Sequence, residues 1–270
     1  MKKIVFPFVA VAMLLGGSLS AFADLTPSEF VQQWNSSGIR VDVSSATPAT
    51  IKYNSGYSSI VDLSGYSTNP GTRTAGRNSQ YSFDSFCLES GSSTPGTNAY
   101  AVLNYDAATG KSYVKNGTST VGTLKVGGAV LYKLFASGEL TGYPYTQSST
   151  AASTLQTAFR VLTGTQTGVN WSTNTYLNYL LTLEDQSYWT QDYNANQYYS
   201  QIGDYSVFVM NMTTSNGIAA QDFLYIAKVT GLIGGGGGVP EPATILFWAI
   251  GGGIGCYVSA RKRKSFSTKV

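Results

Sequence analysis

Phe83-Asp84-Ser85-Phe86-Cys87-Leu88-Glu89 is the stretch that best predicts how the middle of this chain folds. Its short apolar alternation is typical of a β-strand. Cys87, one of only two cysteines in the 270 residues, stands at its centre. We therefore expect a strand region here that carries a single thiol.

The same pattern continues on both sides of this stretch. From Ile39 to Val121, short apolar alternations are separated by Gly, Pro, Ser and Asn, which are typical of turns and loops. Two longer apolar runs, at residues 205–210 and 223–227, are expected to form closing strands before the glycine linker. The expected strands cover residues 39–43, 81–83, 86–88, 99–103, 112–114, 205–210 and 223–227.

Helical spacing of apolar residues appears in four places. Thr26-Pro27-Ser28-Glu29 has the form of a capping box with proline at the first helical position, and this helix should end near Gly38. The other three helices are expected around residues 126–138, from 148–150 to Gly164 and after Ser172, the last with Tyr176, Leu177, Leu180 and Leu181 on its apolar stripe. This order predicts an α+β fold, a β-rich domain with a helical insertion.

The N-terminus has the pattern of a secretory signal peptide over residues 1–23. A basic start is followed by a short apolar run, and Ala21 and Ala23 satisfy the small-residue rule for cleavage before Asp24. We expect export through the Sec translocon and removal of residues 1–23 by signal peptidase. The exported α+β domain would then cover residues 24–233.

The C-terminus has three consecutive parts. The glycines at 234–238 form a flexible linker. Val239-Pro240-Glu241-Pro242 comes next, and an uncharged run over residues 243–260 would span roughly 27 Å as a helix. Arg261-Lys262-Arg263-Lys264 follows and would remain on the cytoplasmic side of the membrane.

This arrangement over residues 239–264 resembles the PEP-CTERM sorting signal. The resemblance implies a Gram-negative-type cell, transient residence in its inner membrane, and recognition by an exosortase-type transpeptidase. Cleavage near Pro240-Glu241-Pro242 would then deliver the protein to the cell surface or to the extracellular polysaccharide matrix. The alternative is a plain single-span anchor after a linker.

The charge of the chain is concentrated in its ends. The formal net charge is +3, but between residues 24 and 238 there are ten basic and 13 acidic residues, so this part carries about −3. Nucleic-acid binding requires a basic face on the folded domain, and we expect none.

Histidine is absent from the sequence, which excludes Ser-His-Asp and Cys-His catalysis as well as histidine-ligated metal sites. We expect no cofactor and no metal. The second cysteine, Cys256, lies in the predicted membrane span, so Cys87 would have no disulfide partner in the exported domain.

Residues from about 80 to 230 resemble the thioester domains of bacterial surface adhesins. The resemblance rests on the aromatic residue before Cys87, the run 128–135, the Leu155-Gln156-x-Ala158-Phe159 segment and Ala220-Gln221-Asp222-Phe223-Leu224. It implies that Cys87 and Gln156 form an internal thioester, which an amine or hydroxyl on a polysaccharide or neighbouring surface would open. Adhesin domains usually have Thr-Gln followed by Ile-Trp, and this chain differs at 155, 158 and 159.

The function predicted from the sequence is therefore that of an exported, non-enzymatic adhesive or scaffold protein. Three alternatives remain open. In the first, Cys87 and Gln156 are purely structural residues. In the second, tyrosines such as Tyr198-Tyr199 bind carbohydrate reversibly. In the third, a pair of carboxylates, Asp84 with Glu89 or Glu184 with Asp185, would make the protein a secreted hydrolase.

Overall fold

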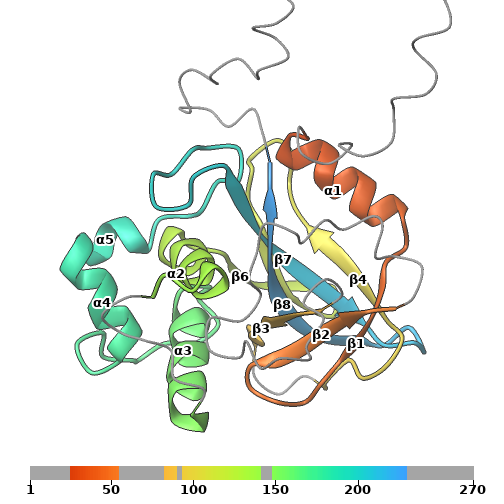
Figure 1. Ribbon diagram of the computed structural model, residues 1–270, viewed down its shortest axis with the longest axis horizontal. Coiled ribbons are helices and arrows are strands. Elements are labelled where there is room, and N and C mark those ends of the chain that lie inside the picture. The colour runs from red at the N-terminus through yellow and green to blue at the C-terminus, as the bar shows by residue number, and fades with distance from the viewer. Residues whose placement is uncertain (1–24, 55–81, 90–92, 141–147, 230–270) are drawn as a thin grey trace, which may run out of the picture. The chain divides into compact units, whose positions relative to one another are not determined.

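The computed structural model describes residues 25–54, 82–89, 93–140 and 148–229 (Figure 1). These residues contain a six-stranded antiparallel sheet with the strand order β3-β2-β1-β4-β7-β8, and a separate hairpin of β5 and β6. The strands of the large sheet are β1 (Arg40–Val43), β2 (Ala49–Tyr53), β3 (Ser82–Ser85), β4 (Ala99–Asn104), β7 (Tyr205–Thr213) and β8 (Ala219–Lys228), and the hairpin consists of β5 (Tyr113–Asn116) and β6 (Ser119–Thr123).

The two edge strands of the large sheet, β3 and β8, meet. The Ser85 hydroxyl donates to the carbonyl of Leu224 at 2.6 Å and accepts from the Leu224 N–H at 3.0 Å. Just beyond β3, Cys87 forms an isolated antiparallel bridge with Phe223, and the Leu88 N–H donates to the carbonyl of Asp222 at 3.0 Å. The sheet is therefore curled so that its two edge strands meet. We call this contact between β3 and β8 the seam, and the segment that carries Cys87 is part of it.

Helices α2 to α5 lie together on one side of the sheet, at the left of Figure 1. Helix α1 lies apart from them, at the upper right of the picture. Nine of the twelve residues of α2 are buried, so this helix is surrounded by protein and contacts both β7 and β8. α3 packs against α4, and α2 packs against α5. The helices are α1 (Pro27–Ser36), α2 (Val126–Ser137), α3 (Ser149–Val161), α4 (Thr175–Leu183) and α5 (Gln186–Trp189).

An aromatic cluster fills the space between α1 and the curled sheet. The ring of Trp34 lies 4.6 Å from that of Tyr225, and the ring of Phe30 stacks on those of Phe208 and Tyr225. The indole N–H of Trp34 donates to the carbonyl of Ala101 on β4 at 2.9 Å. Burial of such large rings is the main stabilising contribution in a core of this kind.

The predicted fold class is confirmed at the level of a β-rich α+β domain. The capping box at Thr26 and Glu29 is formed, α2 ends at Gly138 in the left-handed conformation, and the helices expected after Ser148 and Ser172 are present. Three details of the prediction were wrong. Strands β2 and β6 were not predicted, residues 86–88 form only a bridge, and Leu181 on α4 is exposed.

The predicted targeting segments lie outside the described residues. This applies to residues 1–24, with Ala21, Ala23 and Asp24, and to residues 234–264, with the Pro-Glu-Pro motif, the predicted span and the basic cluster. Within the described ranges, no helix has the length and apolar character needed to cross a membrane.

Candidate functional site

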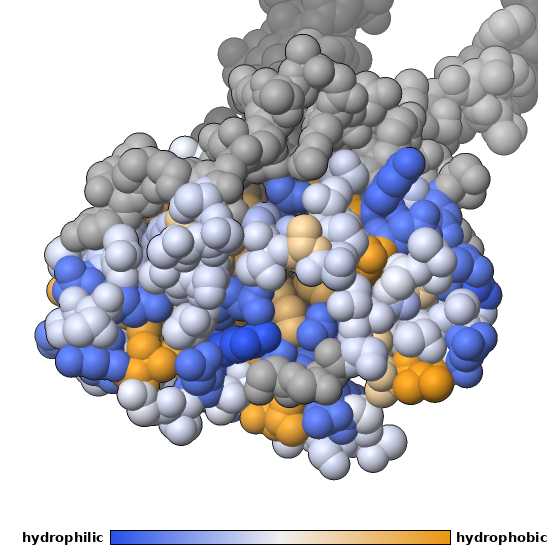
Figure 2. Space-filling model, turned by 90° about the horizontal axis from the view of Figure 1, so that it is seen from below, coloured by the Kyte–Doolittle hydropathy of each residue, from blue (hydrophilic) through white to orange (hydrophobic). Residues whose placement is uncertain are grey.

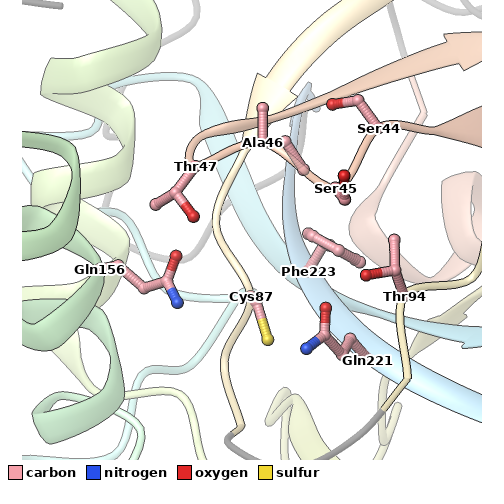
Figure 3. A pocket seen from close by; sticks show the side chains of 10 residues that line it. Ser44, Ser45, Ala46, Thr47, Cys87, Thr94, Gln156, Gln221 and Phe223 are labelled. Carbon is pink, nitrogen blue, oxygen red and sulfur yellow. The ribbon is translucent and has the colours of Figure 1, made fainter. Parts of the chain in front are cut away.

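A pocket opens where the β1–β2 loop, the segment after β3, helix α3 and strand β8 converge. Its volume is about 110 Å³. Cys87 and Gln156, which are far apart in the sequence, both line it (Figure 3). The full lining consists of Ser44, Ser45, Ala46, Thr47, Ala49, Cys87, Thr94, Gln156, Gln221 and Phe223.

Cys87 forms part of the buried wall of this pocket. It is a free thiol with an exposed fraction of 7%, fixed by its bridge to Phe223 on β8. The S–H donates to the backbone carbonyl of Glu89 at 2.8 Å. Burial raises the pKa of the thiol, since the thiolate loses solvation there. The resting group is therefore the neutral thiol.

Gln156 reaches the pocket from α3. This helix begins after Ser148, whose hydroxyl accepts from the Ala151 N–H at 3.1 Å, and its stripe of Ala152, Leu155 and Phe159 is buried in the core. Gln156 lies at the border of that stripe and is half-buried. Its amide extends toward Cys87 (Figure 3). The structure thus places in one pocket the two residues that the resemblance to thioester domains pairs.

Gln221 is a third polar residue of this pocket, to which we assigned no role from the sequence. It extends from β8, on the opposite side of Cys87 from Gln156 (Figure 3). Its backbone N–H donates to the carbonyl of Ser93 at 3.1 Å. Gln221 belongs to the segment 220–224 that carries part of the sequence resemblance, but the sequence does not show that its side chain lines the pocket with Cys87.

The rim of the pocket is neutral and polar. Ser44, Ser45 and Thr47 of the β1–β2 loop and Thr94 are exposed and carry hydroxyls, and Ser44 also accepts from the Thr50 N–H at 2.8 Å. Among the described residues that line the pocket, none is charged. Figure 2 shows the face seen from below in Figure 1, on which polar residues predominate and hydrophobic patches are small and separate. The exposed rim of the pocket is therefore polar, whereas Cys87 lies on its buried wall.

Two buried carboxyls lie behind Cys87. Glu89 has an exposed fraction of 4%, and its Oε1 accepts from the Asp222 N–H at 2.9 Å. Asp222 has an exposed fraction of 1%, and its Oδ2 accepts from the Lys115 N–H at 2.7 Å and from the amide of Asn211. Burial raises the pKa of Asp222 to about 7, against the effect of these donors. Both groups hold strands together around the seam.

The other carboxylates considered from the sequence are placed differently. Asp84 is buried and accepts from the Thr50 hydroxyl at 2.9 Å, whereas Glu184 and Asp185 are exposed at the end of α4. Of these acids, none lines the pocket. Across the described ranges, no three His, Cys, Asp or Glu side chains cluster in a way that could hold a metal ion.

Comparison of the chain with models of known families, with curated proteins and with solved structures gives no match in any of the three.

Proposed function

We propose that this protein is exported and acts at the cell surface or in the extracellular matrix as a non-enzymatic adhesive or scaffold module, through an internal thioester between Cys87 and Gln156. The observation that supports the thioester is the shared pocket, into which a buried thiol and a half-buried glutamine amide project from different elements. The export part of the proposal rests on the two terminal sequence patterns.

The bond would form by acyl transfer within the chain. The sulfur of Cys87 attacks the side-chain carbonyl carbon of Gln156, a C–S bond forms, and the C–N bond of the amide breaks. The thiol proton leaves with the nitrogen as ammonia. The sequence contains no histidine, so proximity of the two groups must supply much of the rate.

The pocket suits a thioester that must stay intact until its target molecule arrives. Cys87 lies on the buried wall, where water has little access, and this protects a thioester from hydrolysis. The hydroxyl-lined rim lies at the exposed end. An amine or hydroxyl of a neighbouring surface or polysaccharide would enter there and attack the carbonyl carbon. The acyl group of Gln156 would pass to that target, and Cys87 would be released as a thiol.

The intact mass of the protein tests this proposal. The mass of the protein released by cells is compared with the mass expected from its sequence, and a Cys87→Ser variant purified in the same way is compared with its own expected mass. A thioester lowers the mass by about 17 Da, because one ammonia is lost. Methylamine should then add to Gln156 and expose one thiol.

Two glutamine variants serve as controls. Gln156→Ala should abolish the mass loss, whereas Gln186→Ala, an exposed glutamine on α5, should retain it. Gln221→Ala tests the other amide of the pocket: loss of the mass change in this variant but not in Gln156→Ala would reassign the acyl group to Gln221. An unshifted mass in the parent protein would rule out the thioester and favour reversible carbohydrate binding.

A further inference from the structure

Arg160 contacts the sulfur of Cys87 from the side of α3. One terminal nitrogen of its guanidinium, Nη2, lies 3.7 Å from the Cys87 Sγ and donates to the carbonyl of Glu89 at 2.9 Å. This carbonyl is also the acceptor of the Cys87 S–H, at 2.8 Å. Thiol and guanidinium therefore share one acceptor and lie next to each other.

We infer that Arg160 is a positioning residue for the thioester, which holds the Cys87 segment against α3 and stabilises the sulfur as a thiolate when the bond forms and when it opens. The inference rests on the proposed function and extends it to a residue that the sequence resemblance does not include.

The placement follows from helix geometry. Arg160 is four residues after Gln156 on α3, so the two side chains lie on the same face one turn apart, with about 5–6 Å between their Cβ atoms. The acyl group and the positive charge are thus presented to Cys87 by one rigid element. A shift of α3 would move both together.

The neighbouring backbone strengthens this attachment. The hydroxyl of Thr165 donates to the carbonyl of Leu88, and the N–H of Thr165 donates to the carbonyl of Arg160 at 2.9 Å. On the opposite side, the same segment is held by β8 through the Leu88 N–H and the Glu89 carboxyl. Cys87 is therefore fixed between α3 and β8, with its sulfur at the guanidinium.

A change of hydrogen-bond donor accompanies ionisation at this site. The neutral thiol donates to the Glu89 carbonyl, but a thiolate has no proton to donate and would be repelled by that oxygen. An N–H of Arg160 already lies beside the sulfur and can take its charge. The Nε–H of Arg160 is buried and has no hydrogen-bond partner among the described residues, so the guanidinium retains donor capacity.

Two charged groups act on the thiol. Burial is the main cause of its raised pKa; the Arg160 guanidinium opposes this shift, and the Glu89 carboxyl adds to it. Removal of Arg160 would take away the largest influence that opposes burial, which disfavours the thiolate further. In thioester opening, the C–S bond breaks and the electron pair remains on sulfur, so the same charge assists the leaving group.

The test combines a pH profile with a rate of opening, both measured on the protein released by cells, and peptide mass distinguishes alkylation of Cys87 from that of Cys256. In a Gln156→Ala background, where no thioester to Gln156 can form, alkylation of Cys87 by iodoacetamide is followed against pH for Arg160, Arg160→Lys and Arg160→Met. In the Gln156 background, methylamine opening is followed by mass. We expect Arg160→Met to raise the alkylation midpoint by about one pH unit and to slow opening roughly tenfold, with smaller effects for Arg160→Lys.

Arg40→Met is the matched control, because Arg40 lies over the ring of Tyr100 on β4 and does not line the pocket. If Arg160→Met fails to fold, the Arg160→Lys variant decides. An unchanged midpoint and an unchanged opening rate in a folded variant would overturn the inference and leave the thioester intact. A shifted midpoint with no mass loss in the parent protein would instead overturn the proposed function while the effect of Arg160 on the thiol remains.

Discussion

The hydroxyl of Ser85 forms two hydrogen bonds with the backbone of Leu224, one as donor and one as acceptor, and so joins the two edges of the sheet. Ser85 is fully buried. We expect Ser85→Ala to lower the free energy of unfolding by about 2–3 kcal/mol, because the Leu224 N–H loses its partner in a place that water does not reach. Urea unfolding followed by circular dichroism measures this change.

Ser112→Ala is a suitable control for that variant. Ser112 is also fully buried, but its hydroxyl makes no hydrogen bond within the described part of the chain. Its removal should leave stability within about 0.5 kcal/mol of the parent protein. Equal effects of the two substitutions would show that the Ser85 bonds contribute nothing to closing the sheet.

A second attachment joins α1 to the sheet through Asn35. Its side-chain amide donates to the carbonyl of Leu103 at 3.0 Å, and its oxygen accepts from the Leu103 N–H at 2.9 Å, so it replaces a strand neighbour at this point of β4. We expect Asn35→Ala to cost about 1–3 kcal/mol in the free energy of unfolding. In Asn35→Asp the ionised carboxylate retains the acceptor only. At pH 4 part of the carboxyl population is protonated and can also donate, so we expect Asn35→Asp to cost less than Asn35→Ala at this pH. A cost for Asn35→Ala no larger than that of the exposed Gln186→Ala would contradict this role.

Asp222 should make stability depend on pH. Its pKa is raised to about 7 in the folded protein, mainly by burial, from an ordinary value of 3.8. Between these values the folded state binds more protons than the unfolded state, so the free energy of unfolding should fall as pH rises from about 4 to about 7. We expect a loss of the order of 1–3 kcal/mol between pH 5 and pH 8.

Asp222→Asn isolates this contribution. Asparagine keeps an oxygen that can accept from Lys115 and Asn211 but does not ionise. The difference in stability between parent and variant should therefore change with pH in the stated direction, whatever other groups titrate. A difference that is constant from pH 5 to pH 8 would mean that the Asp222 carboxyl has an ordinary pKa in the folded state.

The sequence predicted best those elements whose signal is local. Thr26 and Glu29 form a cap within a single turn, and Gly138 ends α2 through its own backbone conformation. β2 was not predicted because its signal is not local. Ala49–Tyr53 has a weakly apolar sequence, and it becomes a strand by pairing with β1 on one side and β3 on the other.

The candidate site was predicted only as a pair of residues. The sequence resemblance associates Cys87 with Gln156, but it does not show that β8 contributes Gln221 or that Arg160 lies at the sulfur. These relationships depend on the closing of β3 against β8 and on the angle at which α3 packs beside that seam. Both arise from contacts between segments far apart in the chain, which no spacing pattern records.

The sorting proposal predicts that Glu241 and the basic cluster Arg261–Lys264 determine where the protein goes. We expect Glu241→Ala, combined with neutral residues at 261–264, to leave uncut protein in the cells, because both the processing motif and the charge that retains the tail in the cytoplasm are lost. Cell fractionation and the C-terminal mass of the product measure this. Glu184→Ala, which removes an exposed acid at the end of α4, is the control. If the altered protein still reached the exterior with the same C-terminal mass as the parent, the sorting proposal would be wrong, and a plain secretory route through the N-terminal signal alone would explain export.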